Sequence, residues 1–160
     1  MNSVQSMLTM GALVLLSLSS LRFNTSVLEN STAQIENKVT LTAFSLADDM
    51  IETIKQRSFD QATVEFPTGL ANLTPPAKLG PETGETYQTF NDIDDYNNYK
   101  KTVSAPHAEN YGVLCTVKYV DGNNPDNEIG TQSYYKKVTV TVTSPYMRDE
   151  VNLSFVFTLK

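Results

Sequence analysis

The hydrophobic and polar residues of this chain follow three successive patterns, and the first is a segment without charge. Residues 1–21 carry no charged side chain, and between Met7 and Leu18 the hydroxyl-bearing residues are Thr9 and Ser17. As a helix, the run from Val4 to Leu21 would be about 27 Å long, just enough to cross a hydrocarbon core. Serine and threonine hydroxyls can bond to the preceding turn, so lipid tolerates them. Residues 1–26 are therefore predicted to form an apolar helix.

The second pattern is amphipathic and covers residues 27–58, which contain neither Gly nor Pro. Apolar residues recur there at helical spacing: Ile35, Val39, Ala43, Ala47, Ile51 and Ile54. Between the two segments, Arg22–Ser26 contains mostly poor helix formers. Either one long N-terminal helix runs over residues 1–58, or it breaks at this junction.

The third pattern, over residues 59–160, predicts a globular β-sheet head. It opens with a Pro/Gly-rich loop at 61–86, where no regular element is expected. Strict alternation of apolar and polar residues then predicts strands, joined by hairpin connections at 121–133 and 144–150. The expected strands are Gly112–Val120, Tyr134–Thr143 and Val151–Leu159, with a weaker one near Tyr99–Ser104.

Together the patterns predict an α+β fold. The second half of the long N-terminal helix should pack on the C-terminal antiparallel sheet, because its apolar stripe alone is long enough to cover one sheet face. The expected helix–sheet core comprises Ile35, Val39, Ala43, Ala47, Ile51, Ile54, Val138, Val140, Val142, Phe155 and Phe157.

Composition excludes several classes of function. The 160 residues have a formal net charge of -6, which argues against a nucleic-acid partner because nucleic-acid binders need a basic surface. The single Cys and single His exclude disulfide frameworks and multi-histidine or cysteine metal sites. No nucleophile or nucleotide-binding motif occurs, so we expect no enzyme activity, no catalytic residue and no cofactor. Cys115 is expected in the core and His107 in a surface loop.

Two acidic loops are weak calcium candidates. Asp121, Asn123, Asp126 and Glu128 alternate along one connection, which suits an ion that takes six to eight oxygen ligands. The alternative is an ordinary turn rich in Asn, Pro and Gly. A second acidic group is a calcium candidate for the same reason and comprises Asp92, Asp94 and Asp95. The alternative is a solvated loop. The preferred expectation is no metal at either place.

Several phrases resemble the type IV pilin-like family of pilins, minor pilins and pseudopilins. The resemblance rests on an uncharged first helix, the helical phrase Ala47–Lys55, the phrase Ser58–Asp60, the phrase Phe90–Tyr96 and the late strand Tyr135–Val142. It implies a structural subunit that waits in the inner membrane and is then assembled by pilus-type machinery into an extracellular filament of its own copies. The family's variable surface loop would correspond to residues 61–86.

The resemblance also implies which residues polymerise. The family carries Glu at the fifth mature position, where this chain has Gln5, whose amide can accept a hydrogen bond from a neighbour's amine without an ion pair. Met1 would be the first mature residue if a leader had already been removed, and Asn24–Ser26 would replace the family's helix-bending Pro. The filament core would contain Met1, Gln5, Met7, Leu8, Met10, Leu13, Leu15, Leu16 and Leu18.

Other interpretations of the first segment stay open. A cleaved signal peptide normally has a basic start, and Met1–Ser3 contains no Lys or Arg. A permanent single-span anchor is the other option. Both lead to the alternative function, a monomeric secreted or membrane-tethered β-domain that binds a ligand or partner.

Overall fold

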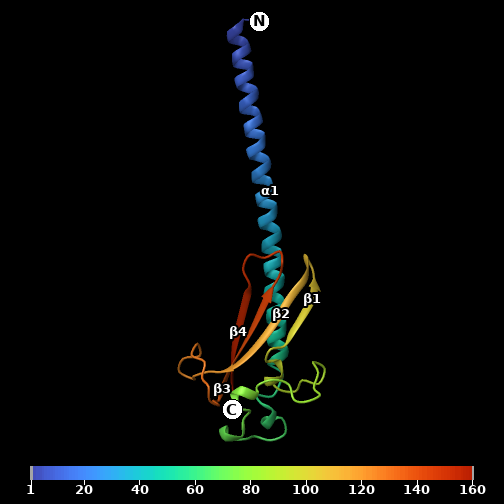
Figure 1. The fold of residues 1–160 in the computed structure, drawn as a ribbon, viewed down its shortest axis with the longest axis vertical. Coiled ribbons are helices and arrows are strands. Elements are labelled where there is room, and N and C mark those ends of the chain that lie inside the picture. Colours follow the sequence, from blue (N-terminus) through green and yellow to red (C-terminus); the bar gives the residue numbers. More distant parts are fainter. Residues whose placement is uncertain (1, 160) are drawn as a thin grey trace. The chain divides into compact units, whose positions relative to one another are not determined.

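A single α-helix and four strands make up most of the regular structure of residues 2–159. The computed structural model describes residues 2–159, with α1 at Ser3–Ile54, β1 at Lys100–Ala105, β2 at Ala108–Tyr119, β3 at Tyr135–Thr143 and β4 at Val151–Thr158 (Figure 1). The fold is α+β, as predicted. The chain forms two compact units, residues 1–38 and 39–160, and we call the second unit the sheet domain.

Helix α1 is continuous through the junction where the sequence left a break open. Arg22–Ser26 is helical throughout, and the Thr25 hydroxyl donates to the Leu21 carbonyl at 3.0 Å. Asn24–Ser26, which the resemblance puts in place of the family's helix-bending Pro, therefore does not interrupt the helix. The helix also ends at Ile54, four residues before the predicted end at Ser58. The main chain of Ser58 instead bonds to a neighbouring segment, donating to Asn91 O at 3.1 Å and accepting from Ile93 N at 3.0 Å.

The sheet is antiparallel with the strand order β1-β2-β3-β4, so each strand lies beside its neighbour in sequence. The three stronger predicted strands and the weaker first one are all present, within a few residues of their expected bounds, although β2 begins four residues early. Cys115 lies opposite Val140 and Val117 opposite Val138, which puts the buried residues of β2 and β3 on one face. His107 occupies the β1–β2 turn with a φ of 75° and is exposed, as expected of a loop residue.

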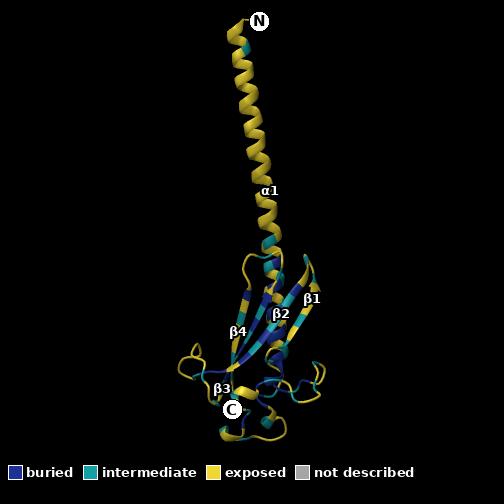
Figure 2. Ribbon diagram, in the orientation of Figure 1, coloured by how far each residue is buried: buried dark blue, intermediate teal, exposed yellow. Residues whose placement is uncertain are grey.

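The core of the sheet domain lies between the second half of α1 and this sheet face (Figure 2). Most of the predicted core is confirmed as buried: Val39, Ala43, Ala47, Ile51, Ile54, Val138, Val140 and Val142, together with Cys115. Phe157 is half-buried and packs against this cluster. Periodicity alone located these positions because each element has one face that must leave water.

Two predicted core residues are corrected. Ile35 is 54% exposed, because burial along α1 begins at Val39. Phe155 is 39% exposed because it lies on β4, the edge strand of the sheet. The Lys55 ammonium lies 4.2 Å from the centre of its ring, and the Phe157 ring packs edge-on at 4.9 Å. Phe155 therefore belongs to the rim of the core.

The irregular chain between α1 and β1 closes one end of the sheet domain. It contains only short 3-10 turns, at Gln61–Thr63, Leu70–Asn72, Pro76–Lys78 and Asp94–Tyr96. It nevertheless contributes buried apolar side chains to the core: Phe59, Leu73, Leu79, Phe90, Ile93 and Tyr96. The loop is thus structured around anchor residues that carry no regular period.

Candidate functional site

The first half of α1 exposes an unusual amount of apolar surface (Figure 2). Thirteen large apolar side chains of residues 4–28 are between 45% and 79% exposed: Val4, Met7, Leu8, Met10, Leu13, Val14, Leu15, Leu16, Leu18, Leu21, Phe23, Val27 and Leu28. Soluble monomers rarely expose contiguous apolar patches of this kind. We call residues 3–28 the apolar segment. An apolar environment outside this chain is needed to cover it.

The apolar residues surround the helix on all sides. Consecutive side chains on an α-helix are about 100° apart, so the run from Leu13 to Leu16 alone passes around most of the circumference. A helix that is hydrophobic all round is buried in a large core or spans a membrane, whereas one lying on a membrane surface needs a polar face. Helix α1 is long and apolar enough by length and composition to cross a membrane, and a signal sequence passes the same test.

Three hydroxyl groups of the apolar segment bond back into the helix. Thr9 donates to Gln5 O at 2.9 Å, Ser17 donates to Leu13 O at 2.8 Å, and Thr25 bonds to Leu21 as described above. Each hydroxyl proton is thereby satisfied without water, which lowers the cost of placing these residues in lipid or against another helix.

The predicted polymerisation residues from Gln5 to Leu18 lie in this segment. Met7, Leu8, Met10, Leu13, Leu15, Leu16 and Leu18 are all exposed. Gln5 Oε1 accepts a hydrogen bond from the Asn2 backbone N–H at 3.3 Å, so its amide oxygen points to the start of the helix. Met1 lies outside the described residues. The proposed role of Gln5 and Met1 in contacts between copies stays a prediction.

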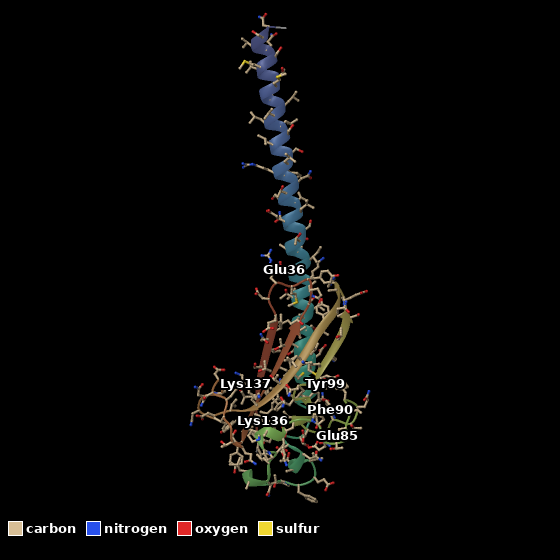
Figure 3. The ribbon with its side chains drawn as sticks, in the orientation of Figure 1. Glu36, Glu85, Phe90, Tyr99, Lys136 and Lys137 are labelled. Atoms are coloured by element: carbon tan, nitrogen blue, oxygen red, sulfur yellow. The ribbon has the colours of Figure 1, made fainter. Side chains whose placement is uncertain are left out.

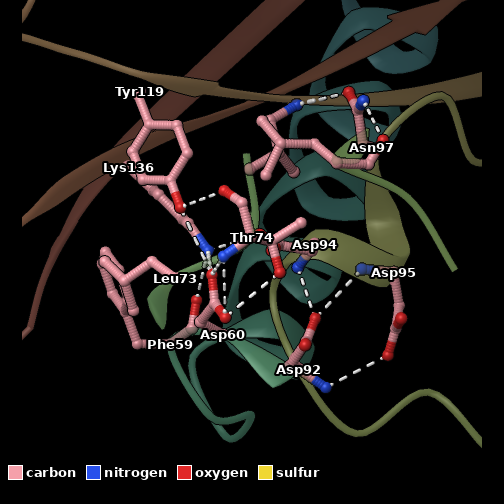
Figure 4. A network of polar contacts seen from close by, with 12 residues as sticks. Phe59, Asp60, Leu73, Thr74, Asp92, Asp94, Asp95, Asn97, Tyr119 and Lys136 are labelled. Carbon is pink, nitrogen blue, oxygen red and sulfur yellow. Dashed lines mark hydrogen bonds and ion pairs between the residues drawn. The ribbon is translucent and has the colours of Figure 1, made fainter. Parts of the chain in front are cut away.

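A second feature is a buried charge network in the sheet domain (Figure 4). The Lys136 side chain is fully buried, and its ammonium lies 2.7 Å from Asp60 Oδ2 and 2.6 Å from Asp94 Oδ1. It also donates to the Phe59 carbonyl at 2.8 Å. Asp60 accepts in addition from the backbone N–H of Thr74 at 2.9 Å. Burial acts to raise the pKa of Asp60, but the hydrogen bond and charge of Lys136 and the backbone donors hold it below its ordinary value.

The acidic group at 92–95 is buried, so the expected solvated loop is wrong. Asp92, Asp94 and Asp95 are at most 1% exposed. Asp92 Oδ1 caps the short turn that follows it, accepting from Asp94 N at 2.7 Å and Asp95 N at 3.2 Å. Burial, and next the neighbouring charges of Asp94 and Asp95, raise the pKa of Asp92 to about 8. Burial also raises the pKa of Asp94 to about 7, against the opposing effect of Lys136.

Sequence reasoning missed Lys136, although the signal for it was present. The alternation that places Val138 on the inner face of β3 also places Lys136 there, since side chains two residues apart share a face. The acidic partners were harder to find. Asp60 and Asp94 come from two irregular segments, and no period indicates that they meet.

The other calcium candidates remain on the surface of the sheet domain. Asp126 is paired with Lys137 at 2.7 Å, and Asp121 Oδ1 accepts from the Asn123 backbone N–H at 2.9 Å. Asn123 and Glu128 are exposed. Among residues 2–159, the acidic side chains whose ligand oxygens gather within 4.8 Å of one another are Glu82, Glu85 and Asp95. Only Asp95 of these was a candidate from sequence.

Comparisons with known proteins found no relative of this chain. No family model, curated protein or solved structure matches the chain.

Proposed function

We propose that this protein is a structural subunit of a type IV pilus-like extracellular filament, which polymerises through the apolar segment of α1. The observation that carries the proposal is the large exposed apolar surface around the whole circumference of residues 3–28. Lipid covers this surface before assembly, and the same segments of neighbouring copies cover it afterwards. The inner membrane is the assembly pool, and pilus-type machinery moves the subunit out of it.

The energetics of such a transfer favour an uncharged segment. Residues 3–21 contain no ionisable side chain, so exchanging lipid for neighbouring helices leaves no charge to desolvate. Lipid tails are about as apolar as leucine side chains, so close packing decides the association of helices. Each contact joins different surfaces of two copies, and repeated head-to-tail contacts with a non-closing rotation produce an open helix. The acidic sheet domain coats the outside.

A charge placed in the apolar segment tests the proposal. Leu13→Asp or Leu16→Asp should reduce filament yield at least about tenfold, because a carboxylate at the centre of a helix costs about 2.5–3.5 kcal/mol in lipid. The measurement is the amount of this chain in filaments sheared from cells, normalised to the total amount of chain in the same cells.

Thr131→Asp is the matched control. It adds the same charge at an exposed position of the sheet domain, between β2 and β3. The control should assemble as the wild type does. Normal filament yield from Leu13→Asp and Leu16→Asp would show that this segment is not the filament core.

A further inference from the structure

A group of unpaired oxygen atoms lies beside the buried charge network, outside the Lys136 contacts. The carboxylate oxygens of Glu82, Glu85 and Asp95 lie within 4.8 Å of one another. Asp95 is fully buried, and the backbone N–H groups of Asn91 and Asp92 hold its Oδ2 at 2.8 Å and 3.1 Å. These two bonds fix the direction of its carboxylate.

Glu85 Oε2 accepts from the Glu82 backbone N–H at 3.1 Å, but three other oxygens of this group have no donor within residues 2–159. Among the described residues, nothing donates a hydrogen bond to Asp95 Oδ1, Glu82 Oε2 or Asn91 Oδ1, although all three atoms are buried. Asn91 belongs to the same group, since its Nδ2 donates to Glu85 Oε1 at 3.3 Å. Buried oxygens without a partner are costly, so such a set needs an explanation. Here the three atoms belong to residues that lie in the 4.8 Å carboxylate group or bond to it.

The charge balance of the region points to a missing cation. Within residues 2–159, the buried side chains of Asp, Glu, Lys, Arg and His are four carboxyl groups, Asp60, Asp92, Asp94 and Asp95, and one ammonium, Lys136. The ammonium is already bound to Asp60 and Asp94. The buried carboxyl groups therefore outnumber the buried ammonium four to one.

We propose that Glu82, Glu85, Asn91 and Asp95 form a calcium-binding site in the sheet domain. All the available ligand atoms are oxygens, which hard cations prefer. Calcium accepts irregular arrangements of six to eight oxygens, including bidentate carboxylates and water, whereas magnesium demands a nearly ideal octahedron. Ligands from two turns of an irregular loop fit the calcium pattern.

Such an ion would tie the loop after α1 to the core. The loop residues Tyr87 and Phe90 pack on Tyr96 and Tyr99, with ring centres 4.9–6.2 Å apart. Figure 3 labels Phe90 and Tyr99 of this cluster and the nearby Glu85. Asp95 is next to Asp94, the partner of Lys136. Calcium at this place therefore holds together the turn at 82–85, the 3-10 turn at Asp94–Tyr96 and, through Asp94, strand β3. This role is independent of filament assembly.

The test is calcium binding by the full chain in nonionic detergent micelles after treatment with a chelator. Titration calorimetry with calcium chloride should give one ion per chain, and calcium should raise the midpoint of thermal unfolding. Glu82→Gln should weaken calcium binding at least about tenfold and remove this rise. With the chelator present, Glu82→Gln should unfold at the same temperature as the wild type or a higher one, because it removes a negative charge from a crowded group.

Asp126→Asn is the matched control, since it removes an exposed carboxylate that pairs with Lys137. It should bind calcium as the wild type does. Glu85→Gln provides a second variant and should also weaken binding. Absence of binding at about 1 mM calcium, equal affinities of all three variants and the wild type, or tighter binding of magnesium than of calcium would each overturn the proposal.

Discussion

At the scale of single residues, Lys136 organises the interior of the sheet domain. Its ammonium joins Asp60, from the chain just after α1, to Asp94, from the turn before β1. The ammonium also lies 4.5 Å from the centre of the Phe59 ring and 5.1 Å from that of the Tyr119 ring. Buried ion pairs add little net stability over apolar residues, but removing one partner leaves an uncompensated charge. The neighbouring Lys137 forms an exposed pair with Asp126 and provides a natural comparison.

Replacing Lys136 should therefore be far more destructive than replacing Lys137. Lys136→Met should lower the free energy of unfolding by about 3–5 kcal/mol, because Asp60 and Asp94 lose their shared counter-ion. Lys137→Met should cost less than about 1 kcal/mol, because its pair is open to water. Urea unfolding of both variants measures the difference. Equal losses would mean that the buried network is not a determinant of stability.

The buried carboxyl groups also set the response to pH. The pKa of Asp92 is raised to about 8 and that of Asp94 to about 7, so the folded state binds more protons than the unfolded state between pH 4 and these values. With a chelator present, stability should fall as pH rises from about 5 to about 8, by at most about 1.4 kcal/mol per pH unit for each group. Thermal unfolding across this range checks the slope.

Asp92→Asn provides the control for this pH dependence. It keeps the Oδ1 acceptor for the backbone N–H groups of Asp94 and Asp95 and removes one titration. The variant should show a shallower fall. A stability that rises with pH over the same range in the wild type would contradict the assignment of these raised pKa values.

At the scale of elements, the sequence pattern predicted most of the buried face of α1 and the sheet but misplaced several individual residues. The buried positions of α1 from Val39 to Ile54, and those of β2 and β3, could be predicted from periodicity because each element buries one face. Ile35 and Phe155 were misplaced because periodicity gives a direction but does not show where the covering element stops. The acidic group at 92–95 was misread because carboxylates are usually exposed, and only tertiary contacts with Lys136 and backbone N–H groups allow its burial.

The sheet domain, which includes the second half of α1, should fold without the first half of this helix. The core of the sheet domain begins at Val39, so no residue of the apolar segment contributes to it. A chain that starts at Val27 should fold cooperatively and stay monomeric without detergent, whereas the full chain should need detergent. Circular dichroism, thermal unfolding and size-exclusion chromatography test this. An aggregated or unfolded product would show that the sheet domain depends on residues 1–26.

At the scale of the whole molecule, charge and hydrophobicity are separated along the chain. All 12 Lys and Arg and all 18 Asp and Glu residues lie at or after Arg22, and the large apolar side chains before it are exposed. A secreted domain with a cleaved signal would discard that segment, while a filament subunit keeps it as its assembly surface. The two functions therefore differ in whether the protein outside the cell still contains residues 1–21.

The most direct measurement is negative-stain microscopy of material sheared from the cell surface, with mass spectrometry of the N-terminal peptide from the same fraction. The account predicts thin filaments that contain this chain with residues 1–21 intact. A soluble species that begins near Leu21 or Arg22, with no filaments containing the chain, would contradict it.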